Sequence, residues 1–220
     1  MSEYEIEPVP GLPEPLPKGE SLLWQAAPGW SALARHSFYL REVAVYFAVL
    51  LTWYLASTLA GGTPLAAVLP ALGQLTLLAG ATLGLIALYA LLLSRTTMFT
   101  VTSRRIVIRS GIALPTVVNI PFRTIQAAGL KSFADRSGNI ALTLQPDEHI
   151  AYLVLWPNVR PWRLSRVEPV LRGIADAAPA AQILARALAA AAEVAPQRMP
   201  AMEWETGAAG QKVRAETAVA

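Results

Sequence analysis

Two long stretches without charged residues dominate the pattern of hydrophobic and polar positions. Residues 43–59 and residues 65–93 carry no charge, and the segment Gly61-Gly62-Thr63-Pro64 separates them. About 20 helical residues cross the roughly 30 Å of bilayer hydrocarbon, so the second stretch is long enough, and the first also suffices if Arg41 and Glu42 lie at the interface. The pattern predicts a transmembrane helical hairpin. The alternative for either stretch alone is the core helix of a soluble protein.

The arginines around this hairpin predict its topology. Arg35 and Arg41 precede the first stretch, Arg95, Arg104 and Arg105 follow the second, and the short loop between the two carries no charge. By the positive-inside rule, segments rich in Lys and Arg stay on the cytoplasmic side. We therefore expect a multi-pass inner-membrane protein with both termini cytoplasmic. The start of the chain lacks the pattern of a secretory signal peptide, so the internal segments would direct insertion.

Beyond the hairpin the hydrophobic pattern changes to that of short strands. Runs rich in β-branched residues alternate with turn residues such as Gly, Pro, Asp and Asn. The predicted strands cover residues 98–102, 105–109, 116–120, 125–130, 140–144 and 150–155. Six strands at this spacing predict a small antiparallel sandwich or barrel.

A helix is expected to close this β domain. Ser165 and Glu168 match a capping box, and Pro169 suits the first turn of a helix. The apolar residues that follow recur at helical spacing, at Val167, Val170, Leu171 and Ile174. Pro179 would end this helix, and residues 180–194 would form a second, alanine-rich helix. That second helix is expected to dock a partner or lie at the membrane interface, with a merely solvated helix as the alternative.

The chain thus divides into six parts. They are a disordered Pro/Glu-rich arm (1–18), an interfacial segment (19–42), the two-helix hairpin (43–93), a cytoplasmic β domain (94–178), an amphipathic helix (179–195) and a disordered tail (196–220). The interfacial segment carries Trp24, Trp30 and Tyr39, which suit the membrane surface. Packing of this segment against the later domain is the alternative.

Some of these residues resemble a known family. The segment 99–111, with Thr102-Ser103-Arg104-Arg105 at a strand turn and Gly111 at the next, followed by Ile120-Pro121, resembles the bacterial PH (pleckstrin-homology-like) domains that follow a membrane hairpin. This resemblance implies an α+β fold, a PH-like small antiparallel β-barrel or sandwich capped by a C-terminal helix.

A narrower resemblance comes from the N-terminal part. Residues 19–25, Gly-Glu-Ser-Leu-Leu-Trp-Gln, with Pro28 and the pair Tyr46-Phe47, resemble the PuhB family of photosynthetic-complex assembly proteins of purple bacteria. This resemblance implies a factor in the inner (intracytoplasmic) membrane that helps assemble the photosynthetic reaction centre, as an oligomer, without remaining in the finished complex. The implied partners are reaction-centre subunits or their assembly intermediates.

Candidate catalytic chemistry is sparse. There is no cysteine, which excludes disulfides, thiolate metal sites and cysteine nucleophiles. His36 and His149 are the only histidines, and neither has a serine or carboxylate partner at an interpretable spacing. No glycine-rich phosphate loop with a following lysine occurs. We therefore expect no enzyme, no metal site and no cofactor. As a separate hypothesis, His36, with Ala32 four residues before it, could ligate a bacteriochlorophyll magnesium; the alternative is a structural histidine.

Charge is concentrated in the β domain. Residues 94–178 hold eleven basic and five acidic residues. So close to a membrane, each Lys or Arg near anionic headgroups contributes about 1 kcal/mol, which makes lipid a better partner than nucleic acid. The predicted lipid-binding or partner-binding residues are Arg95, Arg104, Arg105, Arg109, Trp156, Arg160, Trp162 and Arg163. An ordinary solvated surface is the alternative.

Gly80 and Gly84 form a small-xxx-small pair in the second hydrophobic stretch. Such a pair allows close helix contact, either within the hairpin or between copies of the chain.

The sequence thus leaves two predicted functions. One is the reaction-centre assembly factor implied by the resemblance, and the other is a generic membrane-anchored PH-domain protein that binds anionic lipid or serves in envelope stress. The identity of the neighbouring genes would separate them.

Overall fold

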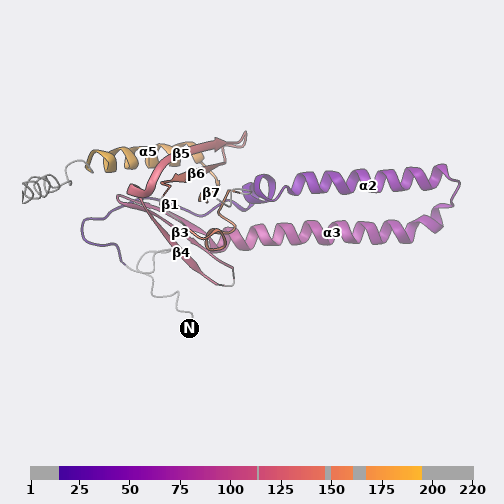
Figure 1. Ribbon diagram of the computed structural model, residues 1–220. Coiled ribbons are helices and arrows are strands. Elements are labelled where there is room, and N and C mark those ends of the chain that lie inside the picture. Colours follow the sequence, from indigo (N-terminus) through magenta and orange to yellow (C-terminus); the bar gives the residue numbers. More distant parts are fainter. Residues whose placement is uncertain (1–14, 113, 147–149, 161–166, 195–220) are drawn as a thin grey trace, which may run out of the picture.

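The computed structural model describes residues 15–112, 114–146, 150–160 and 167–194. It consists of a helical hairpin that projects from a domain of two antiparallel sheets, with one long helix lying along the domain (Figure 1).

The hairpin is formed by α2 (Leu40–Ala60) and α3 (Leu65–Thr96). Both helices are long and apolar enough to cross a membrane, as the absence of charge predicts. No residue of α2 is buried by the protein. At 1.5 Å per residue, α3 is about 48 Å long and α2 about 31 Å, so the C-terminal turns of α3 continue beyond the start of α2 toward the domain.

The hairpin interrupts a pair of neighbouring strands. β1 (Leu22–Ala26) precedes it and β2 (Met98–Thr102) follows it, and the two strands pair antiparallel with Ala26 opposite Phe99. The predicted interfacial segment is therefore partly wrong, because its residues 22–26 form a strand of the first sheet. Trp24 packs against the domain core, which is the alternative stated for this segment.

Within the described residues, seven strands form the two sheets of the domain. In the first sheet the order is β1-β2-β3-β4, with β3 at Arg105–Ser110 and β4 at Thr116–Pro121. A 3₁₀ turn, η3 (Phe122–Thr124), leads to the second sheet. Its order is β5-β6-β7, with β5 at Ile125–Ser132, β6 at Gly138–Leu144 and β7 at Val170–Ile174. The described strands form two separate sheets and not one closed barrel.

The core lies between the two sheets and is closed by α5 (Ala177–Val194). Phe99 and Ile108 of the first sheet and Leu142 of the second are fully buried. They alternate with residues on the opposite face, as the period of two in a strand requires. From α5, Leu184 enters the same core, together with Ala177, Ala180 and Ala187.

The strand β7 corrects the prediction of a helix over residues 167–174. Val170 and Leu171 are consecutive buried residues, a pattern that also fits a helix stripe. Here they pair with Ala141 and Ile140 of β6, and the register shifts between Gly138 and Ile140. The bulge thus lies between Leu171 and Ile174, and it allows these two residues, three apart in sequence, both to enter the domain core.

The capping box is also not used as predicted. The described part of that motif, Glu168, lies before a strand and pairs with Arg160, and Ser165 lies outside the described residues. Pro169, which has no N–H to donate, contributes its carbonyl to Leu142 at the edge of the sheet.

Two further predictions differ from the structure. The predicted strand over 150–155 is a short helix, α4 (Tyr152–Leu155), because a short apolar run without alternation does not distinguish strand from helix. Pro179 does not end a helix but lies in the first turn of α5, where proline is tolerated. α5 is the predicted alanine-rich helix, and its apolar stripe is used by the domain core.

The base of the hairpin is fastened to the domain. A short α1 (Trp30–Ala32) continues into a π-helix, η2 (Leu33–Ser37), ahead of α2. Leu33 and Ala34 pack against Ala90 and Leu93 of α3. The Ser94 hydroxyl donates a hydrogen bond of 2.6 Å to the Pro28 carbonyl.

The end of β7 joins this base as well. The amide of Gly29 donates to the carbonyl of Gly173 at 2.7 Å, and the side chain of Leu33 lies against Gly173. Gly173 has φ of 65°, a left-handed conformation that favours glycine. The second sheet thus contacts the segment that enters α2.

The substitution Gly173→Ala tests whether this segment is a strand. In a helix it would stabilise by up to about 1 kcal/mol. In β7 the left-handed conformation costs roughly 1–2 kcal/mol, and the new Cβ would lie 3.2 Å from the side chain of Leu33. We expect a lower Tm for thermal unfolding in detergent micelles. Gly129→Ala in β5 is the control, because its Cβ would meet nothing within 4 Å. A raised Tm for Gly173→Ala would contradict β7.

Candidate functional site: basic and aromatic side chains of the domain

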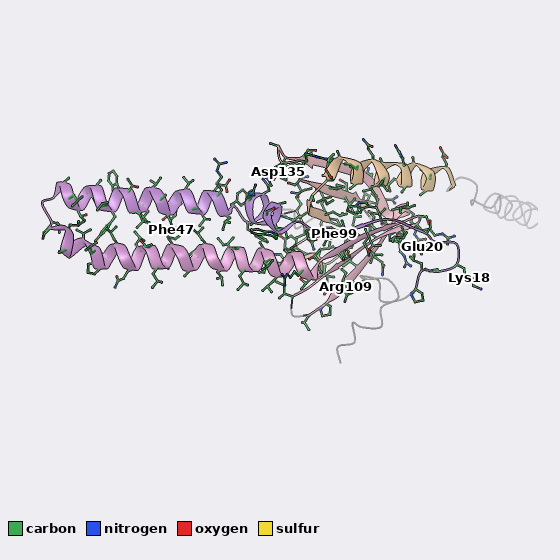
Figure 2. All side chains as sticks on the ribbon, turned by 180° about the vertical axis from the view of Figure 1, so that it is seen from behind. Lys18, Glu20, Phe47, Phe99, Arg109 and Asp135 are labelled. Atoms are coloured by element: carbon green, nitrogen blue, oxygen red, sulfur yellow. The ribbon has the colours of Figure 1, made fainter. Side chains whose placement is uncertain are left out.

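The four arginines predicted to lie together near the headgroups are separated by the fold. β2 leads away from α3, so Arg104 and Arg105, at the β2–β3 turn, lie at the end of the domain remote from the hairpin. In Figure 2, Glu20, the partner of Arg105, is at that remote end, and Arg109 is nearer the helices. Arg104 and Arg105 are therefore not grouped with Arg95 and Arg109, and binding of lipid or of a partner by any of these residues stays a prediction.

Arg105 binds a buried carboxylate. Its Nε donates to Oε1 of Glu20 at 2.9 Å and its Nη2 to Oε2 at 3.0 Å. The Thr102 hydroxyl donates to the same Oε1 at 2.7 Å. The Glu20 side chain is only 3% exposed, and a buried carboxylate needs such partners. Arg105 thus holds the segment before β1 against the β2–β3 turn.

The pKa of Glu20 reflects opposing effects. Burial by itself raises this pKa, whereas the hydrogen bonds from Arg105 and Thr102 and the positive charges of Arg105 and Arg104 lower it. The net result is a pKa below the ordinary value of 4.5. Glu20 was not a candidate at the level of sequence, because its partner lies on the other side of the hairpin.

Two of the predicted arginines do lie at the hairpin end of the domain. Arg95 is exposed in the last turn of α3. Arg109, near the end of β3, pairs with Met98, which follows α3 directly. These two positions are suited to headgroups of a membrane that the hairpin would cross.

The second predicted cluster divides in a similar way. The ring of Trp156 lies 6.1 Å from that of Tyr89 on α3, so this tryptophan is at the hairpin end. Arg160 donates to Glu168 at 2.9 Å, and the Glu168 side chain is buried. Trp162 and Arg163 lie outside the described residues.

His36 has a protein partner in the structure. Its Nε2 lies 3.0 Å from Oδ2 of Asp135, in the turn between β5 and β6, and its ring stacks on Phe133 with centroids 3.8 Å apart. The Ser137 hydroxyl and then His36 lower the pKa of Asp135 to about 2. Ligation of a pigment through Nε2 would require the hydrogen bond to Asp135 to break, so ligation stays a prediction. No signal in the sequence pointed to Asp135 as the partner of His36, because the two residues are 99 positions apart.

The predicted packing glycines do not contact α2. A Cβ placed on Gly80 or Gly84 would meet nothing within 4 Å. The buried residues of α3 lie elsewhere on the helix, at Val68, Ala79, Ala90 and Leu93. Contact of these glycines with another helix stays a prediction. Within the described residues no three His, Asp or Glu side chains gather as a metal site, and His149 lies outside them.

Comparison with known protein families identifies the family of this chain. The model of a bacterial PH domain matches residues 39–188, which is more than half of the chain. The chain belongs to the bacterial PH domain family. The family match begins after β1, so the structure adds β1 to the first sheet of this PH domain.

A relative matches over nearly its whole length. The chain is 35% identical over 191 residues to an "uncharacterized 23.7 kDa protein in puhA 5′ region" of Rhodobacter capsulatus, covering 84% of this chain and 87% of the relative. This match is consistent with the resemblance to the PuhB family. No solved structure matches the chain.

The PH domain provides matched variants for testing the buried ion pair. Arg105→Gln leaves the Glu20 carboxylate buried with fewer hydrogen bonds, and we expect a loss on the order of 2 kcal/mol in the free energy of unfolding. Arg104→Gln removes an exposed neighbouring charge and should cost much less. Chemical denaturation of both variants at neutral pH measures the difference. Equal losses would contradict the role of Arg105.

The same pair predicts a dependence on pH. A carboxyl whose folded pKa is lowered stabilises the fold above its unfolded pKa, and this contribution is lost as the pH falls through the folded value. The difference in stability between the natural chain and Arg105→Gln should therefore shrink as the pH falls below 4.5, the ordinary pKa of the group. Denaturation curves over this acid range would show it. A difference that is constant with pH would contradict the ion pair.

Proposed function

We propose that this chain is a non-enzymatic assembly factor for the photosynthetic reaction centre, which holds a partner protein through a membrane-anchored PH domain. The observation that carries the proposal is the relative named for the 5′ region of puhA, a gene of a photosynthesis operon, whose match covers most of both chains. The gene neighbourhood is the property that separates the two functions considered from sequence.

Anchoring in the inner, intracytoplasmic membrane is the first part of the proposal. β1 and β2 are neighbours, so both helices of the hairpin leave the domain from the same end. Arg35, Arg41 and Arg95 lie at that end, and the connection between the helices has no charge. With the positive-inside rule this arrangement favours a cytoplasmic domain with both termini cytoplasmic.

Recognition of a protein partner is the second part. β5 is the longest of the described strands and is exposed from Gln126 to Ser132. It forms the edge of its sheet among the described strands. An exposed edge can accept an extended segment through main-chain hydrogen bonds, and the small residues Ala127, Ala128 and Gly129 permit close approach. The proposed partners are reaction-centre subunits or their assembly intermediates, and a second copy of the chain in an oligomer.

We prefer binding of a protein partner to catalysis, because charged side chains of this domain are used in ion pairs that stabilise the fold. Glu20 binds Arg105, and Arg160 binds Glu168, in each case with the carboxylate buried. No cofactor is part of the proposal. The alternative, a generic protein that binds anionic lipid, relied partly on Arg104 and Arg105 beside the headgroups, and these residues lie at the remote end.

Deletion of the gene in a phototroph tests the function. We expect a lower near-infrared absorbance of the reaction centre in isolated membranes, restored by the natural gene. Complementation with Leu130→Asp, which places a charge on exposed β5, should restore less than Gln182→Asp on exposed α5. Immunoblots would confirm equal amounts of both variants. Unchanged reaction-centre levels in the deletion strain would overturn the proposal.

A further inference from the structure

The connection between β3 and β4 lies at the hairpin end of the PH domain. Arg109 pairs with Met98, the first residue of β2, and Ser110 pairs with Thr116. The described residues of this connection, Gly111, Ile112, Leu114 and Pro115, must therefore lie near the end of α3, a helix that also contacts β3. Figure 1 shows this turn next to the end of α3.

This connection exposes large apolar side chains. Leu114 is 82% exposed and Ile112 is 41% exposed. Gly111 has φ of 137°, and a Cβ on it would overlap the carbonyl of Leu114, so the connection folds tightly back on itself. A tight turn on the surface of a water-soluble domain would normally carry polar residues.

A second, distant segment exposes apolar side chains at the same end. Trp156 and Val154, at 54% and 43% exposure, belong to the α4 segment, and Trp156 lies against Tyr89 of α3. An apolar groove of about 490 Å³ lies on α3, beside the Tyr89 that Trp156 contacts. It is lined by Phe38, Leu85, Ile86, Leu88, Tyr89 and Leu92.

Because α3 is longer than α2, its apolar surface extends to the hairpin end of the domain. Its apolar run continues to Leu93, about 12 Å beyond the level at which α2 begins, and Leu85 and Leu88, at that level and just beyond it, are more than half exposed. In this part Ala90 and Leu93 are buried, in a cluster with Leu33 and Ala34 of η2. The remaining apolar surface of these turns is continuous with the lipid-facing surface of the hairpin.

We propose that the hairpin end of the PH domain is embedded in the bilayer, with Ile112, Leu114 and Trp156 in the boundary between headgroups and acyl chains around α3. The occupant of this surface is the lipid of the membrane that the hairpin crosses, so the inference depends on the proposed anchoring. Arg95 and Arg109 flank the apolar connection, and their charges would meet lipid phosphates. Aromatic and aliphatic side chains beside basic residues suit this depth.

Embedding has a consequence for the orientation of the domain. The domain is already joined to the hairpin at two points, where the chain enters α2 and where it leaves α3. Contacts of lipid with Leu114 and Trp156 would hold it at two further points beside α3. The domain would then stand at a fixed height and tilt, with β2 and β3 rising from the membrane. The β2–β3 turn, with Arg104, would be the part farthest from the lipid.

The absence of cysteine from the chain permits a direct measurement of depth. Three single-cysteine variants, Leu114→Cys, Leu77→Cys and Gln182→Cys, would carry a nitroxide label in vesicles of phosphatidylglycerol and phosphatidylcholine. Leu77 is 75% exposed in mid-hairpin, and Gln182 is an exposed residue of α5. Electron paramagnetic resonance then compares relaxation by oxygen, which enters lipid, with relaxation by a water-soluble nickel chelate.

We expect the label at residue 77 to be deep in lipid, that at 182 to be in water, and that at 114 to be shallow in lipid, with an oxygen-to-nickel accessibility ratio several-fold above that at 182. A label at 114 that behaves like the one at 182, while 77 is in lipid, would overturn this inference alone. A label at 77 in water would overturn the anchoring in the proposed function. A label at 114 shielded from both reagents would mean that protein, another segment or a second copy, covers this surface, which also excludes lipid.

Discussion

The pairing of β1 with β2 across the hairpin is the constraint on which the rest of the structure depends. Residues directly opposite in an antiparallel pair are about 5 Å apart, so Ala26 and Phe99 bring the chain out of the domain and back at nearly one point. Both helices must therefore start from the same end of one sheet. Packing of Leu33 against Leu93 and the bond from Ser94 to Pro28 then fix the helices to that end.

The two ends of the domain consequently differ in character. At the remote end, the ion pair of Glu20 with Arg105 closes the sheet, and the carboxylate is removed from water. At the hairpin end, Ile112, Leu114 and Trp156 are exposed and apolar. The charges of Glu20 and Arg105 thus stabilise the fold at the remote end. The exposed apolar side chains Ile112, Leu114 and Trp156 lie at the hairpin end, where a membrane would be.

The sequence predicted the elements that have local signals. The hairpin follows from the absence of charge, and β2 to β6 follow from β-branched runs and turn residues. β7 was missed because Val167, Val170, Leu171 and Ile174 fit a helix stripe as well as they fit a bulged strand. β1 was missed because its Trp and Leu residues also suit a membrane surface. In the pairs Glu20–Arg105 and His36–Asp135, one residue precedes the hairpin in sequence and the other follows it. A local sequence pattern cannot predict such pairs.

The misplaced arginines show why nearness in sequence is a poor guide to nearness to the membrane. Five residues of β2 rise by about 17 Å at roughly 3.3 Å each. The Debye length at physiological salt is about 8 Å, so a charge at the far end of β2 would scarcely interact with headgroups at the end of α3 if the hairpin crosses a membrane. Arg95 and Arg109 would remain within range, since Arg109 returns along β3 to lie opposite Met98. The β5–β6 turn, which includes Arg136, also lies at the hairpin base, where Asp135 contacts His36. Arg104 and Arg105, at the far end of β2, would therefore be too distant for such headgroups, and Arg105 instead stabilises the domain through its ion pair with Glu20.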